Sequence, residues 1–229
     1  MNKSILNPDE LFEFINQKLT PNVKNKKERG EVFTPLRLIN AMLDKIPKEV
    51  WANPDLKWLD PAVGIGNFPI IAYLNLMDGL KEWQPNEEKR RKHILENMLY
   101  MVEINNNNII ILNELLCGCS SGSDRKYKFY IHTGDFLEAD LNKIFGIEKF
   151  DIIMGNPPYQ KQVGPNKTQP IWNLFTNLSI DKLNLDGYLI FIHPSGWRNI
   201  TGNFRDVYDK VMSTKLIYIN MNNFKKGNK

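Results

Sequence analysis

Short apolar runs alternate along this chain with longer stretches of helical periodicity. Several runs are apolar nearly throughout, such as DIIMG and YLIFI, which is typical of strands covered on both faces. Strands that alternate with helices indicate a parallel sheet joined by right-handed crossovers. The sequence therefore predicts a doubly wound, mostly parallel α/β fold with strands at Lys57–Leu59, Leu99–Ile104, Lys128–His132, Phe150–Gly155 and Tyr188–His193.

Helical periodicity also marks the N-terminal part of the chain. Asn7 and Pro8 suit the start of a helix, and the apolar residues up to Leu19 fall on one face. A polar, basic segment, TPNVKNKKERG, follows and is typical of a loop. A second helix is predicted after Pro35 from the spacing of Leu36, Ile39, Leu43 and Ile46. We therefore expect an N-terminal helix and basic loop over residues 1–29 and one large domain over residues 30–229.

Composition excludes several classes of protein. The 229 residues carry a formal net charge of +4, which permits a nucleic-acid partner without requiring one. Cys117 and Cys119 cannot form a disulfide framework or a four-ligand zinc site, and the three histidines have no partners at metal-ligand spacing. No apolar run reaches the roughly 20 residues of a membrane helix, and the first residues lack a signal-peptide core. The sequence predicts a cytoplasmic protein without a bound metal.

The first candidate site follows the first predicted strand, in the segment LDPAVGIGNF (residues 59–68). Ligands of open α/β sheets bind beyond the carboxyl ends of the strands, and small residues there let a ligand approach the backbone. Pro69 stands where a dinucleotide fingerprint would have its third glycine, so the segment suits a ligand without phosphate. A tight strand-to-helix turn would explain the segment equally well.

Two acidic residues end the next strands. Glu103 can accept hydrogen bonds from a pair of ribose hydroxyls, although a solvated carboxylate is the simpler interpretation of this residue alone. Asp135 can accept a hydrogen bond from an adenine amino group, with Phe136 against the ring. An ordinary Gly-Asp turn is an equally good interpretation of Asp135 and Phe136.

The most distinctive segment is the tetrapeptide of Asn156, Pro157, Pro158 and Tyr159, directly after the strand DIIMG. The prolines fix the backbone and remove two donors, which leaves carbonyl groups that can accept hydrogen bonds from a ligand. Asn156 adds a side-chain carbonyl, and Tyr159 adds an aromatic face. Such a group can hold a planar amine, and a purely structural turn is the weaker interpretation at this position.

Basic residues cluster at Lys24–Arg29 and Lys89–Lys92, and Lys161 and Lys167 follow the tetrapeptide. Such stretches are usually solvated surface. On an enzyme that acts on nucleic acid, they would contact phosphates.

Together these segments resemble the amino-group DNA methyltransferases of the gamma arrangement, in which the cofactor motifs precede the catalytic one. GEVFTP (residues 30–35) is similar to motif X, LDPAVGIGNF to motif I, and NPPY to motif IV. GYLIFIHPSGW (residues 187–197) is similar to the following strand of the family. The resemblance implies a class I S-adenosylmethionine-dependent, Rossmann-like fold.

The resemblance also implies roles for individual residues. Those expected to bind S-adenosylmethionine are Thr34, Pro35, Asp60, Pro61, Ala62, Gly64, Gly66, Phe68, Glu103, Ile104, Asp135 and Phe136. Thr34, Pro35, Asp60, Ala62 and Gly64 would hold the methionine end. Glu103 would bind the ribose, and Asp135 and Phe136 the adenine.

The implied acceptor is an adenine flipped out of double-stranded DNA. The side chain of Asn156 and the carbonyl of Pro157 would accept hydrogen bonds from its amino group, and Tyr159 would stack on the base. Methyl transfer would then be a direct in-line displacement, driven by positioning and fixed dipoles.

The chain departs from the family near its end. Members continue past the strand predicted at Leu216–Asn220 into a further strand and a target-recognition domain, whereas this chain stops at Lys229. A separate specificity or C-terminal subunit would supply what is missing. The main hypothesis is adenine methylation in DNA for restriction-modification or self-protection. The alternatives are methylation of protein glutamine or RNA adenine, or an inactive cofactor-binding subunit that needs a partner.

Overall fold

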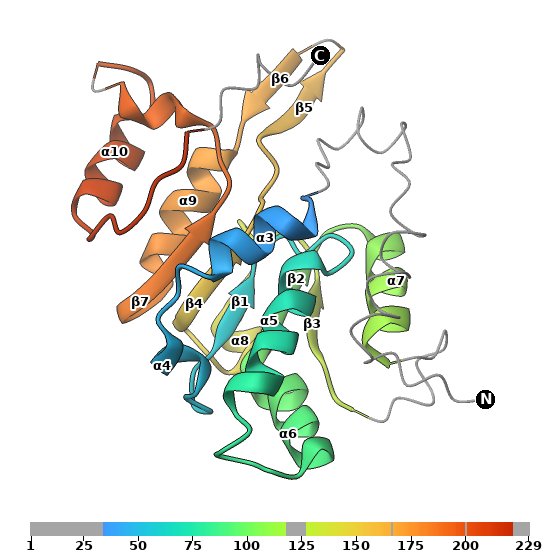
Figure 1. The fold of residues 1–229 in the computed structure, drawn as a ribbon. Coiled ribbons are helices and arrows are strands. Elements are labelled where there is room, and N and C mark those ends of the chain that lie inside the picture. The colour runs from blue at the N-terminus through green and yellow to red at the C-terminus, as the bar shows by residue number, and fades with distance from the viewer. Residues whose placement is uncertain (1–33, 118–126, 166, 200, 222–229) are drawn as a thin grey trace, which may run out of the picture.

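A five-stranded parallel sheet forms the centre of the molecule (Figure 1). The computed structural model describes residues 34–117, 127–165, 167–199 and 201–221. The strand order is β3-β2-β1-β4-β7. The strands are β1 (Trp58–Asp60), β2 (Leu99–Glu103), β3 (Tyr130–Thr133), β4 (Phe150–Gly155) and β7 (Leu183–Phe191). The predicted doubly wound α/β fold is thus confirmed.

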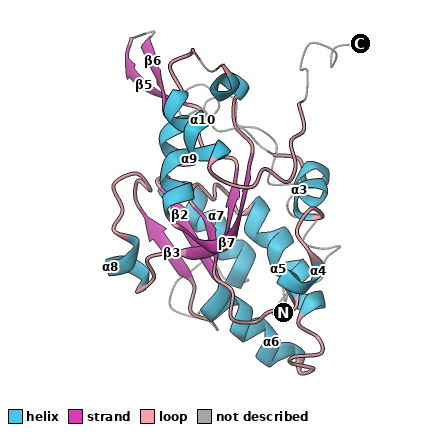
Figure 2. Cartoon of the chain, turned by 90° about the vertical axis from the view of Figure 1, so that its left-hand side faces the viewer, coloured by secondary structure: helices cyan, strands magenta, loops and turns pink. Residues whose placement is uncertain are grey.

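Helices cover both faces of the sheet, as the two views show (Figures 1 and 2). The apolar side chains of α3, α5, η1 and α7 pack on one face, and those of α8 and α9 on the other. A third apolar cluster joins α9, η3 and α10 beside the edge strand β7. The bounds are α3 (Leu36–Leu43), α4 (Lys48–Trp51), α5 (Asn67–Gly79), α6 (Glu87–His93), η1 (Ile94–Met98), α7 (Asn106–Cys117), α8 (Leu141–Phe145), α9 (Trp172–Asp181), η3 (Ser195–Arg198) and α10 (Arg205–Met212).

The apolar strands divide their side chains between the two layers of core. Trp58 faces the first layer and Leu59 the second, because successive side chains of a strand point to opposite faces. Ile152 and Ile153 of β4 do the same. All four side chains are fully buried, and each such burial contributes about 1.5–3 kcal/mol. The continuous apolar runs seen in the sequence therefore follow from a sheet that has no solvated face.

The helix predicted after Pro35 is α3. Ile39 and Leu43 are fully buried against α5, and Ile46 lies just beyond the helix end. Phase and position agree with the prediction. The helix and loop predicted over residues 1–29 lie outside the described residues, as do the first four residues of GEVFTP.

The hairpin after the tetrapeptide and the last strand of the sheet differ from the sequence prediction. An antiparallel hairpin, β5 (Gln160–Gly164) and β6 (Lys167–Pro170), follows the tetrapeptide and was not predicted. The last strand of the sheet, β7, begins at Leu183 rather than at Tyr188, and its register shifts where it passes Phe150 and Ile152 of β4.

The strand predicted at Leu216–Asn220 is wrong. Residues 215–221 have no regular secondary structure, and the apolar side chains of this segment are about half exposed. A strand needs a neighbouring strand for its backbone hydrogen bonds. The edge strand β7 pairs only with β4 in the described part of the chain, so residues 216–220 do not extend the sheet there. The apolar composition of this segment was therefore not enough to predict a strand.

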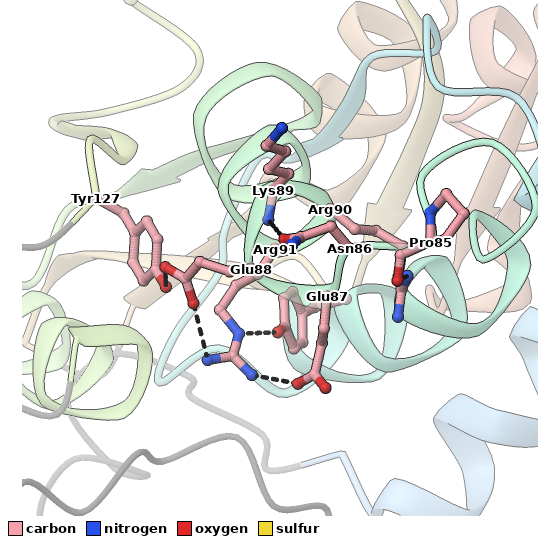
Figure 3. Close-up of polar contacts among 9 residues, drawn as sticks. Pro85, Asn86, Glu87, Glu88, Lys89, Arg90, Arg91 and Tyr127 are labelled. Carbon is pink, nitrogen blue, oxygen red and sulfur yellow. Dashed lines mark hydrogen bonds and ion pairs between the residues drawn. The ribbon is translucent and has the colours of Figure 1, made fainter.

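The basic residues at Lys89–Lys92 lie in α6, and two of them are held by specific contacts rather than solvated (Figure 3). Arg90 is only 5% exposed and donates to the carbonyls of Gln84 and Pro85. Arg91 pairs with Glu87 and donates to the hydroxyl of Tyr73. These two arginines hold α6 to the fold at the amino end of the sheet, so the interpretation of the whole stretch as solvated surface is corrected.

Neither a membrane helix nor a metal cluster is found in the described ranges. No helix there is long and apolar enough to cross a bilayer. No group of three or more metal-ligating side chains gathers there either.

Candidate functional site

The polar residues singled out in the sequence meet at the carboxyl edge of the sheet. Asp60 ends β1 and Glu103 ends β2, and these two strands pair directly in parallel. Asp135 follows β3, which pairs with β2, and Asn156 follows β4, which pairs with β1. The topology thus brings four segments that are distant in sequence to one edge.

Glu103 shapes the turn after β1. One carboxylate oxygen accepts from the backbone N–H of Gly64 at 2.7 Å, and the other accepts from that of Asn105 at 2.7 Å. Gly64 has φ +57°, a left-handed conformation that glycine adopts without strain, and a side chain at this position would point into open space. The turn therefore leaves room for a ligand directly over the motif I backbone.

Asp60 is a buried carboxylate beside that turn. It is 2% exposed, and burial raises its pKa from 3.8 to about 8, while a hydrogen bond from the N–H of Ala62 lowers the pKa and the charge of Glu103 raises it. Gly155 at the end of β4 lies so close that an added Cβ would stand 2.9 Å from the Asp60 oxygen. Glycine at this position lets the tetrapeptide begin directly against the carboxylate.

Thr34 links Asn156, the candidate catalytic residue, to Asn67 at the start of α5. Its hydroxyl accepts a hydrogen bond from the amide nitrogen of Asn156 at 3.0 Å, and its backbone carbonyl accepts one from the side chain of Asn67 at 3.3 Å. Thr34 is 5% exposed. Because the Asn156 nitrogen donates to Thr34, the side-chain carbonyl of Asn156 is fixed in orientation.

Tyr159 belongs to an aromatic corner beside the tetrapeptide. It packs, half-buried, against the cluster that contains Trp172 and Trp197, and burial raises its pKa. Trp172 stacks in parallel on His193 at 5.5 Å between ring centroids. Burial lowers the pKa of His193, which favours the neutral imidazole. Through Tyr159, this corner adjoins the end of the tetrapeptide.

The remaining predicted cofactor residues take different positions. Ile104 is 65% exposed at the rim, whereas Phe68 is buried in the core. Asp135 is half-buried and accepts from the N–H of Leu137. Phe136 is 1% exposed and stacks on Phe175 of α9, so it belongs to the core layer. Its contact with an adenine ring stays a prediction.

The small residues of the motif I turn and the exposed start of α3 complete the set. Ala62 is half-buried, and Pro61 and Gly66 are buried. Pro35 is exposed at the start of α3.

Sequence reasoning missed Asn67 and His193 as parts of this site. Asn67 lies inside the segment LDPAVGIGNF, so its polar side chain at the start of α5 was the available signal. His193 carried no signal in the sequence, because its role depends on stacking with Trp172, which lies on another element.

The charge of the edge suits a cationic ligand such as S-adenosylmethionine. Asp60 is buried, and no lysine or arginine in the described ranges forms an ion pair with it. A ligand with a sulfonium and an ammonium group would offset the cost of a buried carboxylate charge. The space next to Gly64 is open, so a ligand can approach the backbone of this turn.

Comparison with solved structures defines the class of fold. The chain superimposes with a TM-score of 0.55 on a Listeria monocytogenes protein assigned to the class I S-adenosylmethionine-dependent methyltransferases, at 15% identity and over 90% of this chain and 58% of the other. It also superimposes with a TM-score of 0.58 on a Vibrio vulnificus protein assigned as the modification subunit of a type I restriction enzyme, at 20% identity and over 88% and 41% of the two chains. The fold is that of the class I methyltransferases.

Sequence comparison narrows the class to one family. Residues 70–228 match the Eco57I restriction-modification methylase family, and the chain belongs to that family. It is 29% identical to an uncharacterized adenine-specific methylase of Mycoplasma pneumoniae, over 88% of this chain and 64% of that protein. The chain thus spans less than two thirds of the length of this relative.

Proposed function

We propose that this chain transfers a methyl group from S-adenosylmethionine to the 6-amino group of adenine in DNA. The observation that carries the proposal is the hydrogen bond between Thr34 and Asn156, which fixes the amide of Asn156 beside the buried carboxylate of Asp60. Membership of the Eco57I restriction-modification methylase family supports the same reaction.

The cofactor would lie over the motif I turn. Asp60, Thr34 and Gly64 would hold its charged methionine end, and Glu103, Ile104 and Asp135 would line the ribose and adenine portion. S-adenosylmethionine supplies, when bound, a methyl group on a positively charged sulfur. The buried Asp60 favours a positive group at this edge, and the neighbouring glycines allow close approach to the backbone.

The tetrapeptide would hold the target base. The Asn156 side-chain carbonyl and the Pro157 backbone carbonyl would accept the two hydrogens of the adenine amino group, which turns its lone pair toward the methyl donor. Tyr159 would stack on the base against the aromatic corner of Trp172. Because the dipoles are fixed before the base arrives, they stabilise the transition state without reorganisation.

The biological setting we propose is a cytoplasmic restriction-modification or self-protection system. Sequence specificity would come from a target-recognition domain or a partner subunit. Adding such a partner is therefore expected to raise the rate and selectivity of methylation.

The experiment is a competition among acceptors. The chain is incubated with S-adenosylmethionine labelled in the methyl group and with duplex DNA, RNA or a glutamine-containing release-factor protein. We expect label on duplex DNA, in the adenine base. Label on protein glutamine or on RNA alone would contradict the proposal, and cofactor binding without any transfer would favour the inactive-subunit alternative.

A further inference from the structure

The β5–β6 hairpin begins one residue after Tyr159 and projects beyond the carboxyl edge of the sheet, away from the core, in both views (Figures 1 and 2). Its base is closed by a hydrogen bond from the N–H of Ile171 to the carbonyl of Tyr159 at 3.1 Å. The hairpin is therefore hydrogen-bonded directly to the residue that we expect to stack on the target base.

The hairpin contributes almost nothing to the core. Every described residue in it is exposed except Gly164, and even Val163 is 48% exposed. A two-stranded hairpin without a packed face is marginal in water. Packing therefore does not dictate which side chains the hairpin carries. We interpret these side chains as groups that contact a ligand.

That chemistry is positive and rich in amides. The segment QKQVGPNKTQP contains two lysines, three glutamines and a threonine but no acidic residue. Lys161 lies opposite Gln169, and Gln162 lies opposite Thr168, so both faces of the ribbon carry long polar side chains. Lysines suit phosphate oxygens, whereas glutamine amides can both donate to and accept from base edges.

We propose that the β5–β6 hairpin is a DNA-binding ribbon that enters a groove of the duplex beside the flipped base. The major groove of B-DNA, about 12 Å wide, admits a two-stranded β-ribbon. Lys161 and Lys167 contact the phosphates that flank the target nucleotide. This inference rests on the proposed function, because it needs DNA as the substrate.

The salt dependence of DNA binding tests the proposal. Each lysine that contacts a phosphate contributes about 0.9 to the slope of log affinity against log salt. The double variant Lys161→Gln and Lys167→Gln should therefore lower the slope by about 1.8, so between 50 and 200 mM salt it loses roughly tenfold less affinity than the wild type. Fluorescence anisotropy of a labelled duplex measures both quantities.

A matched control removes the same charge elsewhere. Lys48 in α4 and Lys143 in α8 are exposed and lie before β1 and β4, at the amino edge of the sheet. The double variant Lys48→Gln and Lys143→Gln should keep the wild-type slope. Binding of S-adenosylmethionine by calorimetry should be the same for both double variants, which shows that each is folded.

The outcomes separate this inference from the proposed function. If the wild type binds duplex DNA and the hairpin variant keeps its slope, or both double variants lose slope equally, the hairpin assignment is overturned while the proposed function stands. If the wild type binds RNA but not duplex DNA, both are overturned. A reduced slope in the hairpin variant alone supports the inference.

Discussion

At the scale of single residues, the buried Asp60 makes stability depend on pH. Its pKa is about 8 in the folded chain and 3.8 unperturbed, so between these values the folded state keeps a proton that the unfolded chain has released. The stabilisation is fully present below the unperturbed pKa and is lost as pH rises toward 8.

Replacement of Asp60 by Asn should therefore remove this dependence. Relative to the wild type, Asp60→Asn should gain stability as pH rises from 5 to 7, by up to about 1.4 kcal/mol per pH unit. Urea denaturation of both proteins across this range measures the difference. A wild-type curve that stays parallel to that of the variant would show that Asp60 is ionised in the fold.

Thr34 is the second residue with a specific expectation. Thr34→Val keeps the shape but removes the oxygen that accepts from Asn156, a hydrogen bond of about 1 kcal/mol. We expect kcat for DNA methylation to fall at least about fivefold, and Thr34→Ser to restore most of it. Steady-state kinetics at saturating cofactor gives the comparison. Equal kcat for Thr34→Val and the wild type would mean that Thr34 does not orient Asn156.

At the scale of elements, the sequence predicted those whose formation depends on burial within a regular pattern. The strands β1, β2 and β4 were found because their apolar runs are covered on both faces. The hairpin β5–β6 was missed, because its polar strands show no alternation of buried and exposed residues. Its formation depends on cross-strand pairing rather than on packing.

The segment at residues 216–220 illustrates the opposite error. Its apolar pattern suits a strand, but the described structure offers it no partner, and Ile219 is 47% exposed. Apolar composition predicts a tendency to pair, whereas the pairing itself depends on a neighbour that a local pattern cannot reveal.

Matched isoleucine substitutions test this difference between elements. Ile153→Ala, in the fully buried centre of β4, should cost about 2–5 kcal/mol of unfolding free energy. Ile219→Ala should change it by no more than about 0.5 kcal/mol, as expected at an exposed position. Both values come from urea denaturation. A cost at Ile219 as large as that at Ile153 would mean that the segment is packed after all.

At the scale of the whole molecule, the parallel topology assembles the site. Asp60, Glu103, Asp135 and Asn156 each end a strand or follow one, and their convergence was predictable because parallel strands end at the same edge. The link between Thr34 and Asn156 spans 122 residues and was not predictable from local pattern. It depends on how α3 packs against α5.

The same topology separates the basic residues into two groups. Arg90 and Arg91 lie in α6 at the amino end of the sheet, where they bond to Gln84 and Tyr73. Lys161 and Lys167 lie on the hairpin at the carboxyl end (Figure 1). Charge clusters in sequence therefore do not by themselves identify a nucleic-acid surface. The position of a basic cluster relative to the candidate site indicates whether the cluster can contact nucleic acid.

We propose that Asn156 holds the adenine amino group during methyl transfer. The most direct measurement is nucleoside analysis by mass spectrometry of duplex DNA incubated with S-adenosylmethionine and either the wild type or Asn156→Ala. We predict N6-methyladenine with the wild type, and a rate lower by on the order of 10²–10³-fold with the variant at unchanged cofactor affinity. Undiminished methylation by Asn156→Ala, or methyl groups on cytosine carbon, would contradict the claim.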